Sequence, residues 1–456
     1  MISSGGSVIL QRVLRALSTG LTRLRGRIIT VNPQALITDY ISEEDEGVRV
    51  EANGVQDLVR GVPRIPTLDD LEESLGRYQV LSIDGSSRLV RTESCNITVA
   101  SVALYSGRYG LIADYPCYFS SLSYERVMEL FRESFISLQP RVRLREYELA
   151  SLETELRREA GHLVRVKSPA GAWYDCDYNM WQVADEARLM LETRALEIAL
   201  EHINSFAIYG SGTLVVLDGP LYPTPRIFYY RGDVREDYLN SYGVLIERRV
   251  RLLRLADERG INVLGVVKRL ADSHKLYRCD EMIALISRLR GQRVRLEKAP
   301  DEEVVAEAVR LLRQRGYARF ADVIAIGPFR LSLTESDKLR KFVHAEIPDK
   351  YAIYLWMPVS PYWGEEGFVL RIEATPGTWS RMGMDSILYL LAYGINRVKG
   401  VPRLIEAPDE VSRRVARVYF VHIAWGIAPI SPLSYETRVE LSQEGEEGVG
   451  IPTWIS

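Results

Sequence analysis

Two aspartates occupy the same local context in this chain. Asp84 follows the largely apolar run 78–83, Asp218 follows the apolar residues 215–217, and each is followed directly by glycine. Ligands and catalytic groups gather beyond the carboxyl ends of strands in open α/β sheets. A single Asp-Gly pair is more often a simple turn. Its repetition after two apolar runs makes a shared functional site about as probable as two turns.

A third carboxylate lies on the apolar face of a helix that we predict over residues 180–205. At 100° per residue, Glu192 falls on a stripe of leucine and isoleucine side chains, whereas Glu197 falls on the opposite, solvated side. A buried carboxylate is costly unless it is paired or ligates a cation. Glu192 is therefore either a metal ligand or half of a buried Glu–Arg pair.

Asp84, Glu192 and Asp218 together would present hard oxygen ligands, which suit Mn²⁺ or Mg²⁺ and not zinc. Two such ions close together can activate a water molecule and stabilise the leaving oxygen of a phosphodiester. Competing chemistry has little support. The five histidines form no HxH or HExxH motif, and the chain has no GxSxG, P-loop or GxGxxG motif after a strand.

Basic and aromatic residues near these carboxylates are candidates for contacts with a nucleic acid. Lys268 ends the apolar run 261–267 and could stabilise charge on a phosphate. Arg88 could also contact phosphate, and Tyr230 and Arg231 could stack on bases and bind the backbone. A surface lysine and an aromatic packing cluster are the corresponding structural alternatives.

A mixed α/β core has to position these side chains. Three strands in a meander are predicted first, and then helix, strand, helix and strand alternate. The ranges are 78–83, 94–105 and 109–119 for the meander, followed by 180–205, 213–217, 239–259 and 261–267. This order predicts a mixed sheet covered by helices, and it is the element order of a ribonuclease H-like core.

We divide the chain into three parts. Residues 1–76 form a leader with an acid-free amphipathic helix at 8–24 and a linker, and residues 77–430 form the main domain. That domain includes a charged helical insertion at about 122–178, and residues 431–456 form a polar, loose tail. The leader helix could imitate a transit peptide, but packing on the body or on a partner is the favoured interpretation.

Composition sets further limits. A net charge of −3 argues against a uniformly basic nucleic-acid-binding surface, although it leaves room for a local basic groove. No uncharged apolar run reaches the length of about 18 residues typical of a membrane span. The four cysteines form no CxxC pair, which predicts reduced thiols in a cytoplasmic protein.

Five segments, in order, resemble motifs of the NurA family of archaeal DNA end-processing nucleases. They are VLSIDGS at 80–86, MLE at 190–192, VVLDGPL at 215–221, GVVKR at 265–269 and GVPRLIEA at 400–407. The resemblance covers roughly residues 77–415. It implies a ribonuclease H-like fold and a homodimer that cleaves single- and double-stranded DNA with Mn²⁺. It also implies work with a HerA-like hexameric ATPase, a DNA translocase, in end resection and double-strand break repair.

Under this resemblance Asp84, Glu192, Asp218 and Lys268 would be catalytic, and the three carboxylates would bind the metal. One position departs from the family: the C-terminal motif should end in histidine, but here Pro408 follows it. A second hypothesis is therefore a catalytically impaired scaffold that docks the translocase or holds DNA ends. An Argonaute-like relative is disfavoured because the chain lacks room for guide-binding modules.

The resemblance also suggests a use for the leader helix. Its apolar face could dock on the translocase, and Arg12, Arg15 and Arg23 could meet acidic residues there or contact the DNA backbone.

Overall fold

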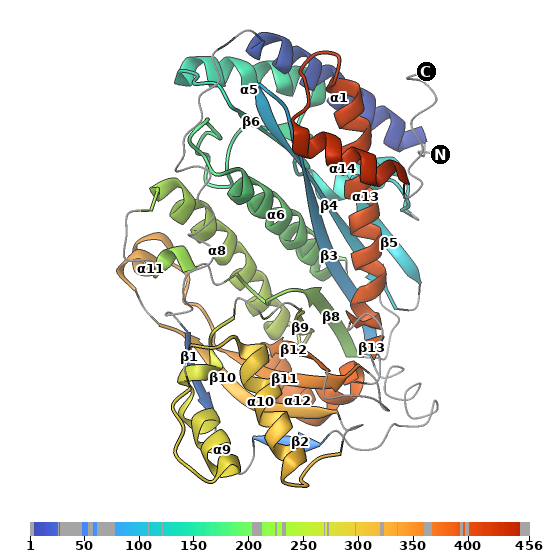
Figure 1. Cartoon of the computed structure of the whole chain (residues 1–456). Coiled ribbons are helices and arrows are strands. Elements are labelled where there is room, and N and C mark those ends of the chain that lie inside the picture. Colours follow the sequence, from blue (N-terminus) through green and yellow to red (C-terminus); the bar gives the residue numbers. More distant parts are fainter. Residues whose placement is uncertain are drawn as a thin grey trace.

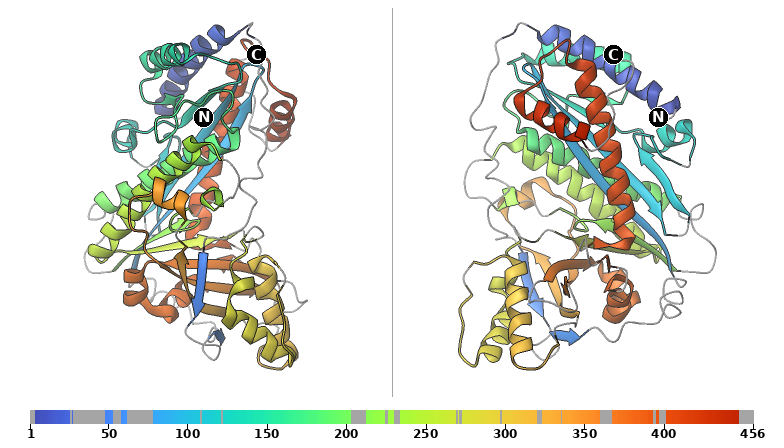
Figure 2. Two further views of the ribbon diagram at one scale, coloured as in Figure 1. Left: turned by 90° about the vertical axis from the view of Figure 1, so that its left-hand side faces the viewer. Right: turned by 45° about the vertical axis from the view of Figure 1, so that its right-hand side comes forward.

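A long mixed β-sheet runs through the molecule and carries helices on its faces (Figures 1 and 2). The computed structural model describes most of the 456-residue chain. The described residues are 4–25, 27, 48–52, 58–61, 78–107, 109–120, 122–202, 212–223, 226–229, 234–268, 270, 273–296, 298–319, 323–334, 336–359, 367–392, 395–396 and 401–446.

The strands of the described chain have the following bounds. They are β1 Val48–Ala52, β2 Val59–Gly61, β3 Tyr78–Arg91, β4 Cys95–Ser106, β5 Gly110–Tyr115, β6 Ile136–Pro140, β7 Val164–Arg165, β8 Gly212–Asp218, β9 Asn262–Val267, β10 Ile324–Leu333, β11 Lys350–Pro358, β12 Gly367–Ala374, β13 Ile395–Asn396 and β14 Val401–Pro402.

The helices are α1 Ser4–Leu24, α4 Tyr124–Phe131, α5 Glu146–Ala160, α6 Met180–Glu201, α8 Glu236–Glu258, α9 Asp280–Arg290, α10 Asp301–Gln314, α11 Asp337–Phe342, α12 Pro376–Ala392, α13 Arg403–Ile427 and α14 Tyr435–Glu446. Two short 3₁₀ turns, η3 Arg226–Phe228 and η4 Leu276–Arg278, complete the described elements.

Twelve of the described strands form one sheet, in the order β1-β10-β11-β12-β9-β8-β3-β4-β6-β7, with β2 beside β10 and β5 beside β4. Within it, β3, β4 and β5 form an antiparallel meander. Strand β8 then pairs parallel to β3, and β9 pairs parallel to β8. With α6 and α8 as the intervening helices, this is the predicted ribonuclease H-like core.

Helices cover both faces of β3 and β4, so these strands are apolar on both sides. Helix α6 packs on one face and α13 on the other (Figure 1). The first part of β3 is buried almost continuously. This double cover brings side chains from α6 and α13 to the same place on β3, where the first aspartate motif lies.

The second half of the sheet extends the core. Strand β12 pairs antiparallel with β9 and leads to β11 and β10. Helices α9 and α10 share one apolar cluster with β10 and β11, and α12 shares another with β8, β9, β11 and β12. This half supports β9, from which Lys268 emerges.

Several element boundaries differ from the sequence-based expectation. Strand β3 continues through Asp84 to Arg91, because β4 pairs with it over its whole second half. The expected helical insertion at 122–178 also contributes β6 and β7 to the sheet. The expected linker contributes β1 and β2, which pair with β10. Part of the expected loose tail forms α14, which contacts β3 and α13.

The leader helix α1 packs on α5 and α13 of the same chain. Its apolar face, which includes Ile9, Val13, Leu17 and Leu21, is almost entirely buried. Arg23 forms an ion pair of 2.9 Å with Glu155 of α5. Packing on the body is thus confirmed for α1. The apolar face that we expected to dock on a translocase is already covered, and Arg23 meets an acid of its own chain.

All four cysteines are free and buried. No helix in the described ranges is long and apolar enough to cross a membrane.

Candidate metal centre

The two aspartate motifs lie side by side where the parallel pairing of β3 and β8 ends. Ile83 and Leu217 form the last parallel pair, so Asp84 and Asp218 follow it on adjacent strands. Their glycines have different roles. Gly219, directly after β8, has φ of 124°, a backbone conformation that favours glycine. Gly85 stays within β3, where an added Cβ would lie 2.7 Å from Cγ of Glu192.

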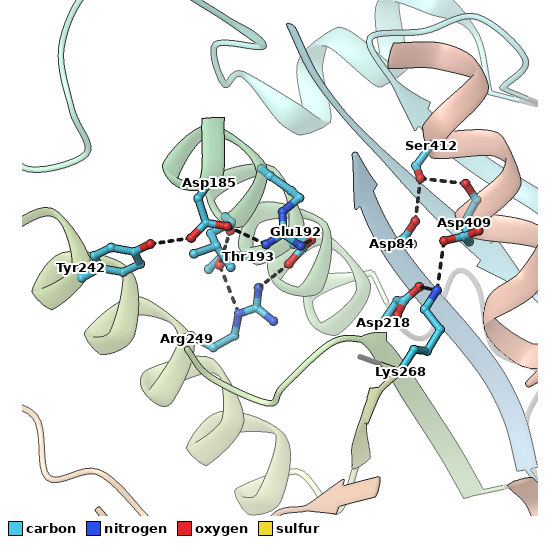
Figure 3. Close-up of polar contacts among 12 residues, drawn as sticks. Asp84, Asp185, Glu192, Thr193, Asp218, Tyr242, Arg249, Lys268, Asp409 and Ser412 are labelled. Atoms are coloured by element: carbon cyan, nitrogen blue, oxygen red, sulfur yellow. Dashed lines mark hydrogen bonds and ion pairs between the residues drawn. The ribbon is translucent and has the colours of Figure 1, made fainter. Parts of the chain in front are cut away.

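Three aspartates converge at this point. The carboxylates of Asp84, Asp218 and Asp409 offer oxygens that all lie within 4.8 Å of one another (Figure 3). Asp409 comes from α13, directly after Pro408, the residue at which the family motif departs. The sequence-based prediction therefore included two members of this group and missed the third.

Among the three aspartates, Asp84 has the pKa that is raised most clearly. Burial raises its pKa well above the ordinary value, and the charges of Asp218, Glu192 and Asp409 raise it further. The opposing contact is a hydrogen bond of 2.6 Å donated by the Ser412 hydroxyl. No ion pair found among the described residues includes Asp84. A divalent cation would relieve this unbalanced negative charge, so the donor set fits Mn²⁺ or Mg²⁺.

Lys268 bridges the other two aspartates, as its position after β9 allows. Its Nζ contacts Asp218 Oδ2 and lies 3.0 Å from Asp409 Oδ1. Burial alone would lower the pKa of Lys268, but the charges of Asp218 and Asp409 raise it above the ordinary value. The lysine therefore remains charged beside the carboxylates and holds Asp218 and Asp409 together.

Glu192 is buried against β3, as the apolar stripe predicted, but it lies outside the group of three. Arg188 Nη1 is 3.2 Å from its Oε1, and Arg249 Nη2 is 3.6 Å from its Oε2. Burial raises the pKa of Glu192, while Arg188 and Arg249 lower it. The structure thus shows the buried Glu–Arg pairing that was the alternative to a ligand role. Glu192 nevertheless lies close to the residue after Asp84, because a Cβ added to Gly85 would be 2.7 Å from Glu192 Cγ.

Ser412 holds two elements of the site together. It lies one turn after Asp409 on α13 and donates to Asp84 Oδ2, while its own backbone carbonyl accepts a bond of 2.6 Å from Ser101 of β4. Asp409 and Ser412 are spaced i,i+3, so they share one helix face. That spacing, in a helix after the last family motif, was the signal available in the sequence.

The remaining candidates fall outside the cluster. Arg88 forms an ion pair of 2.8 Å with Glu440 of α14. Tyr230 and Arg231 lie outside the described residues, and the neighbouring Tyr229 donates to the Thr334 carbonyl at 2.9 Å. His422 lies on α13 beyond Asp409, at ~20 Å along the helix by its rise of about 1.5 Å per residue. It is therefore too far along the helix to replace the family histidine.

Several solved structures and one family model are similar to this chain over most of its length. No curated protein matches it. Among solved structures, the NurA nuclease from Sulfolobus solfataricus is similar with 10% identity and a TM-score of 0.38, over 91% of this chain and 93% of the other. A NurA structure bound to dAMP and manganese is similar with 9% identity and a TM-score of 0.32, over 76% and 86% of the two chains.

A further NurA structure with manganese is similar with 8% identity and a TM-score of 0.35, over 96% of this chain and 97% of the other. The NurA domain matches residues 78–414, from the start of β3 to the first half of α13. That span contains all four candidate carboxylates and Lys268. With most of the chain matched, the protein belongs to the NurA family.

Proposed function

We propose that the protein is a metal-dependent deoxyribonuclease that hydrolyses phosphodiester bonds at the centre formed by Asp84, Asp218 and Asp409. The convergence of these three carboxylates on a NurA domain carries the proposal. Membership of the family supports a nuclease. Manganese is present in two of the similar NurA structures and dAMP in one of them, which supports a divalent cation and a DNA-type substrate.

The residues of the centre have two roles: the aspartates would bind a metal cation, and Lys268 would stabilise negative charge on the phosphate. Asp84, Asp218 and Asp409 would bind Mn²⁺ or Mg²⁺, which when bound supplies Lewis acidity toward a phosphate oxygen and an attacking water. Ser412 orients Asp84 through its hydroxyl. Lys268 keeps a positive charge beside Asp218 and Asp409, where it can stabilise the negative charge that develops on phosphate.

The impaired scaffold is the second candidate, and it rests on Pro408. A NurA-like chain without its last ligand would dock DNA ends or a translocase without cutting. Here the carboxylate of Asp409 stands next to the altered position and joins Asp84 and Asp218. This supports an active centre in which a carboxylate takes over from the family histidine.

Cleavage of labelled single- and double-stranded DNA tests the proposal. The wild type should degrade both in Mn²⁺, more slowly or not at all in Mg²⁺, and not in EDTA. Asp218→Asn should lower kcat by at least about 100-fold, the loss typical of removing one charge-stabilising group. Asp337→Asn, an exposed change in α11, should retain wild-type rates. DNA binding without any Mn²⁺-dependent cleavage by the wild type would instead support the scaffold.

The proposed assembly is a homodimer that acts in DNA end resection and double-strand break repair with a HerA-like hexameric translocase. Family membership is the support for this part. Light scattering measures the mass of the isolated protein, and co-elution with a HerA-type hexamer tests the partnership. A monomer that fails to co-elute and whose resection rate is unchanged by the hexamer would contradict it. Because the apolar face of α1 is packed on α5 and α13, we propose that docking uses another surface.

A further inference from the structure

Both oxygens of Glu192 are already engaged by cations. Arg249 comes from α8, is almost completely buried and donates through Nε to Thr193 Oγ1 at 3.1 Å. It approaches Oε2, while Arg188 approaches Oε1. A second metal ion on Glu192 would have to displace at least one of these guanidinium groups. Burial and the hydrogen bond to Thr193 hold Arg249 in position, so its guanidinium group stays beside Oε2 of Glu192.

Arg188 is held at the border of the aspartate cluster by a second acid. Its Nη2 lies 2.6 Å from Asp185 Oδ1, and the other oxygen of Asp185 accepts a hydrogen bond from Tyr242 of α8 (Figure 3). Its stem lies on β3, because a Cβ on Gly85 would be 3.1 Å from Arg188 Cγ. The side chain is therefore positioned from three elements, next to Asp84.

The same side chain is also accessible and charged. Arg188 is 35% exposed, against 3% for Arg249 and 8% for Glu192. The charge of Glu192 raises the pKa of Arg188 despite its desolvation, and those of Asp185 and Asp84 add to this. A guanidinium fork of this kind can bind two phosphate oxygens at once.

We propose that Arg188 serves as the second cation of the centre. It fills the place on Glu192 that a second metal ion would need, and it contacts a phosphate oxygen of the substrate, so the chain binds a single divalent cation at Asp84, Asp218 and Asp409. This inference rests on the proposed nuclease function. It departs from the two-ion arrangement that the three predicted carboxylates suggested, and it makes Glu192 a positioning residue for Arg188.

Counting the bound metal ions tests the single-cation part of the proposal and requires no DNA cleavage assay. Titration followed by electron paramagnetic resonance should count one Mn²⁺ per chain in the wild type. Glu192→Gln should keep an Mn²⁺ affinity close to that of the wild type, whereas Asp84→Asn should weaken it by at least about tenfold. Two Mn²⁺ ions in the wild type, or equal losses in the two variants, would overturn the inference.

The phosphate contact is tested by binding of labelled oligothymidylate in Ca²⁺ at several salt concentrations. Arg188→Gln should weaken binding and make the slope of log K against log salt shallower by about 0.7, the effect of one contact to single-stranded DNA. Arg188→Lys should restore most of the slope. The control is Arg157→Gln in α5, which removes another i,i+4 Arg–Glu pair. A slope for Arg188→Gln equal to that of this control would refute the contact.

The two levels of failure are distinguishable. A wild type that binds no Mn²⁺ and cuts no DNA would remove the proposed function itself. A wild type that cuts DNA with two bound Mn²⁺ ions would remove only the role of Arg188. Metal counting on the wild type needs no variant, so the inference can be tested even if Arg188→Gln does not fold.

Discussion

Among the described residues, every carboxylate of the centre except Asp84 forms an ion pair with a basic side chain. Lys268 accompanies Asp218 and Asp409, and Arg413 also lies 2.8 Å from Asp409. Arg188 and Arg249 accompany Glu192. Asp84 has a hydroxyl from Ser412 as its compensating partner. A cation-binding site needs such an acid, because a fully neutralised set of carboxylates would have little affinity for an added ion.

Asp409→Asn tests the residue that the sequence analysis missed. We expect Mn²⁺ affinity to fall by about 100-fold or more, since loss of an outer-shell partner alone typically costs about 10–100-fold. Isothermal titration with Mn²⁺ measures the change, and DNA cleavage should fall with it. Glu410→Gln is the matched control, because Glu410 is exposed and pairs with Arg414 at 2.7 Å. If the two neighbours behave alike, Asp409 is not a ligand.

At the scale of elements, α6 must be held firmly for Arg188 and Glu192 to face β3. Its first half is anchored by Glu186, which is fully buried and accepts hydrogen bonds from Tyr174 at 2.9 Å and Tyr178 at 2.8 Å. Gln182, one turn earlier, donates to the same carboxylate at 3.2 Å. Asp185 directly precedes Glu186 and Arg188 lies two residues after it, so this network helps to fix the position of both.

Glu186 should make stability depend on pH. Burial raises its pKa from 4.5 to about 7, although its hydrogen bonds lower it. The unfolded chain releases this proton first, so stability is full below pH ~4.5 and declines as the pH rises through about 7. The loss is at most ~3.5 kcal/mol, at about 1.4 kcal/mol per pKa unit.

Urea unfolding with EDTA at several pH values measures this effect. Glu186→Gln keeps an oxygen that can accept from the tyrosines but removes the charge, so its stability should fall less than that of the wild type between pH ~5 and ~7. Glu201→Gln, at an exposed position of the same helix, should follow the wild type. Parallel curves for wild type and Glu186→Gln would show that another group causes the pH dependence.

At the scale of the whole molecule, the N-terminal helix is part of the main core. Helix α1 joins the same apolar cluster as β3, β4, α6 and α13. It crosses α5 and α13 at the end of the molecule away from α9 and α10 (Figures 1 and 2). Since α13 carries Asp409, α1 stabilises the far end of the helix that completes the metal centre.

Leu17→Ala should therefore destabilise the protein. Leu17 is 0% exposed, and truncating a buried leucine typically costs ~2–5 kcal/mol. Val8 in the same helix is 47% exposed, and Val8→Ala should change stability by less than about 0.5 kcal/mol. The urea midpoint of each variant measures the difference. Equal midpoints would mean that α1 leaves the body in solution, and its apolar face would again be available to a partner.

Sequence patterns alone predicted most of the ribonuclease H-like core. Apolar runs located β3, β4, β5, β8 and β9, because a strand buried on one or both faces requires such residues. Helical periodicity placed Glu192 on the buried face of α6. Short elements were harder to predict. Strand β6 lies in a charged stretch between two helices, and its five residues are too few for a periodic pattern that distinguishes a strand from a helix.

From the sequence alone, a common site for Asp84 and Asp218 could be predicted, since each ends a predicted apolar run and the carboxyl ends of parallel strands meet at one edge of a sheet. The residues that join this pair come from helices distant in the sequence, and their approach depends on tertiary packing. Asp409 lies beside Asp84 and Asp218 because α13 packs across β3. Arg249 of α8 forms an ion pair with one oxygen of Glu192. Local periodicity encodes which face of an element is buried, whereas the partner of a buried charge depends on packing between elements far apart in the chain.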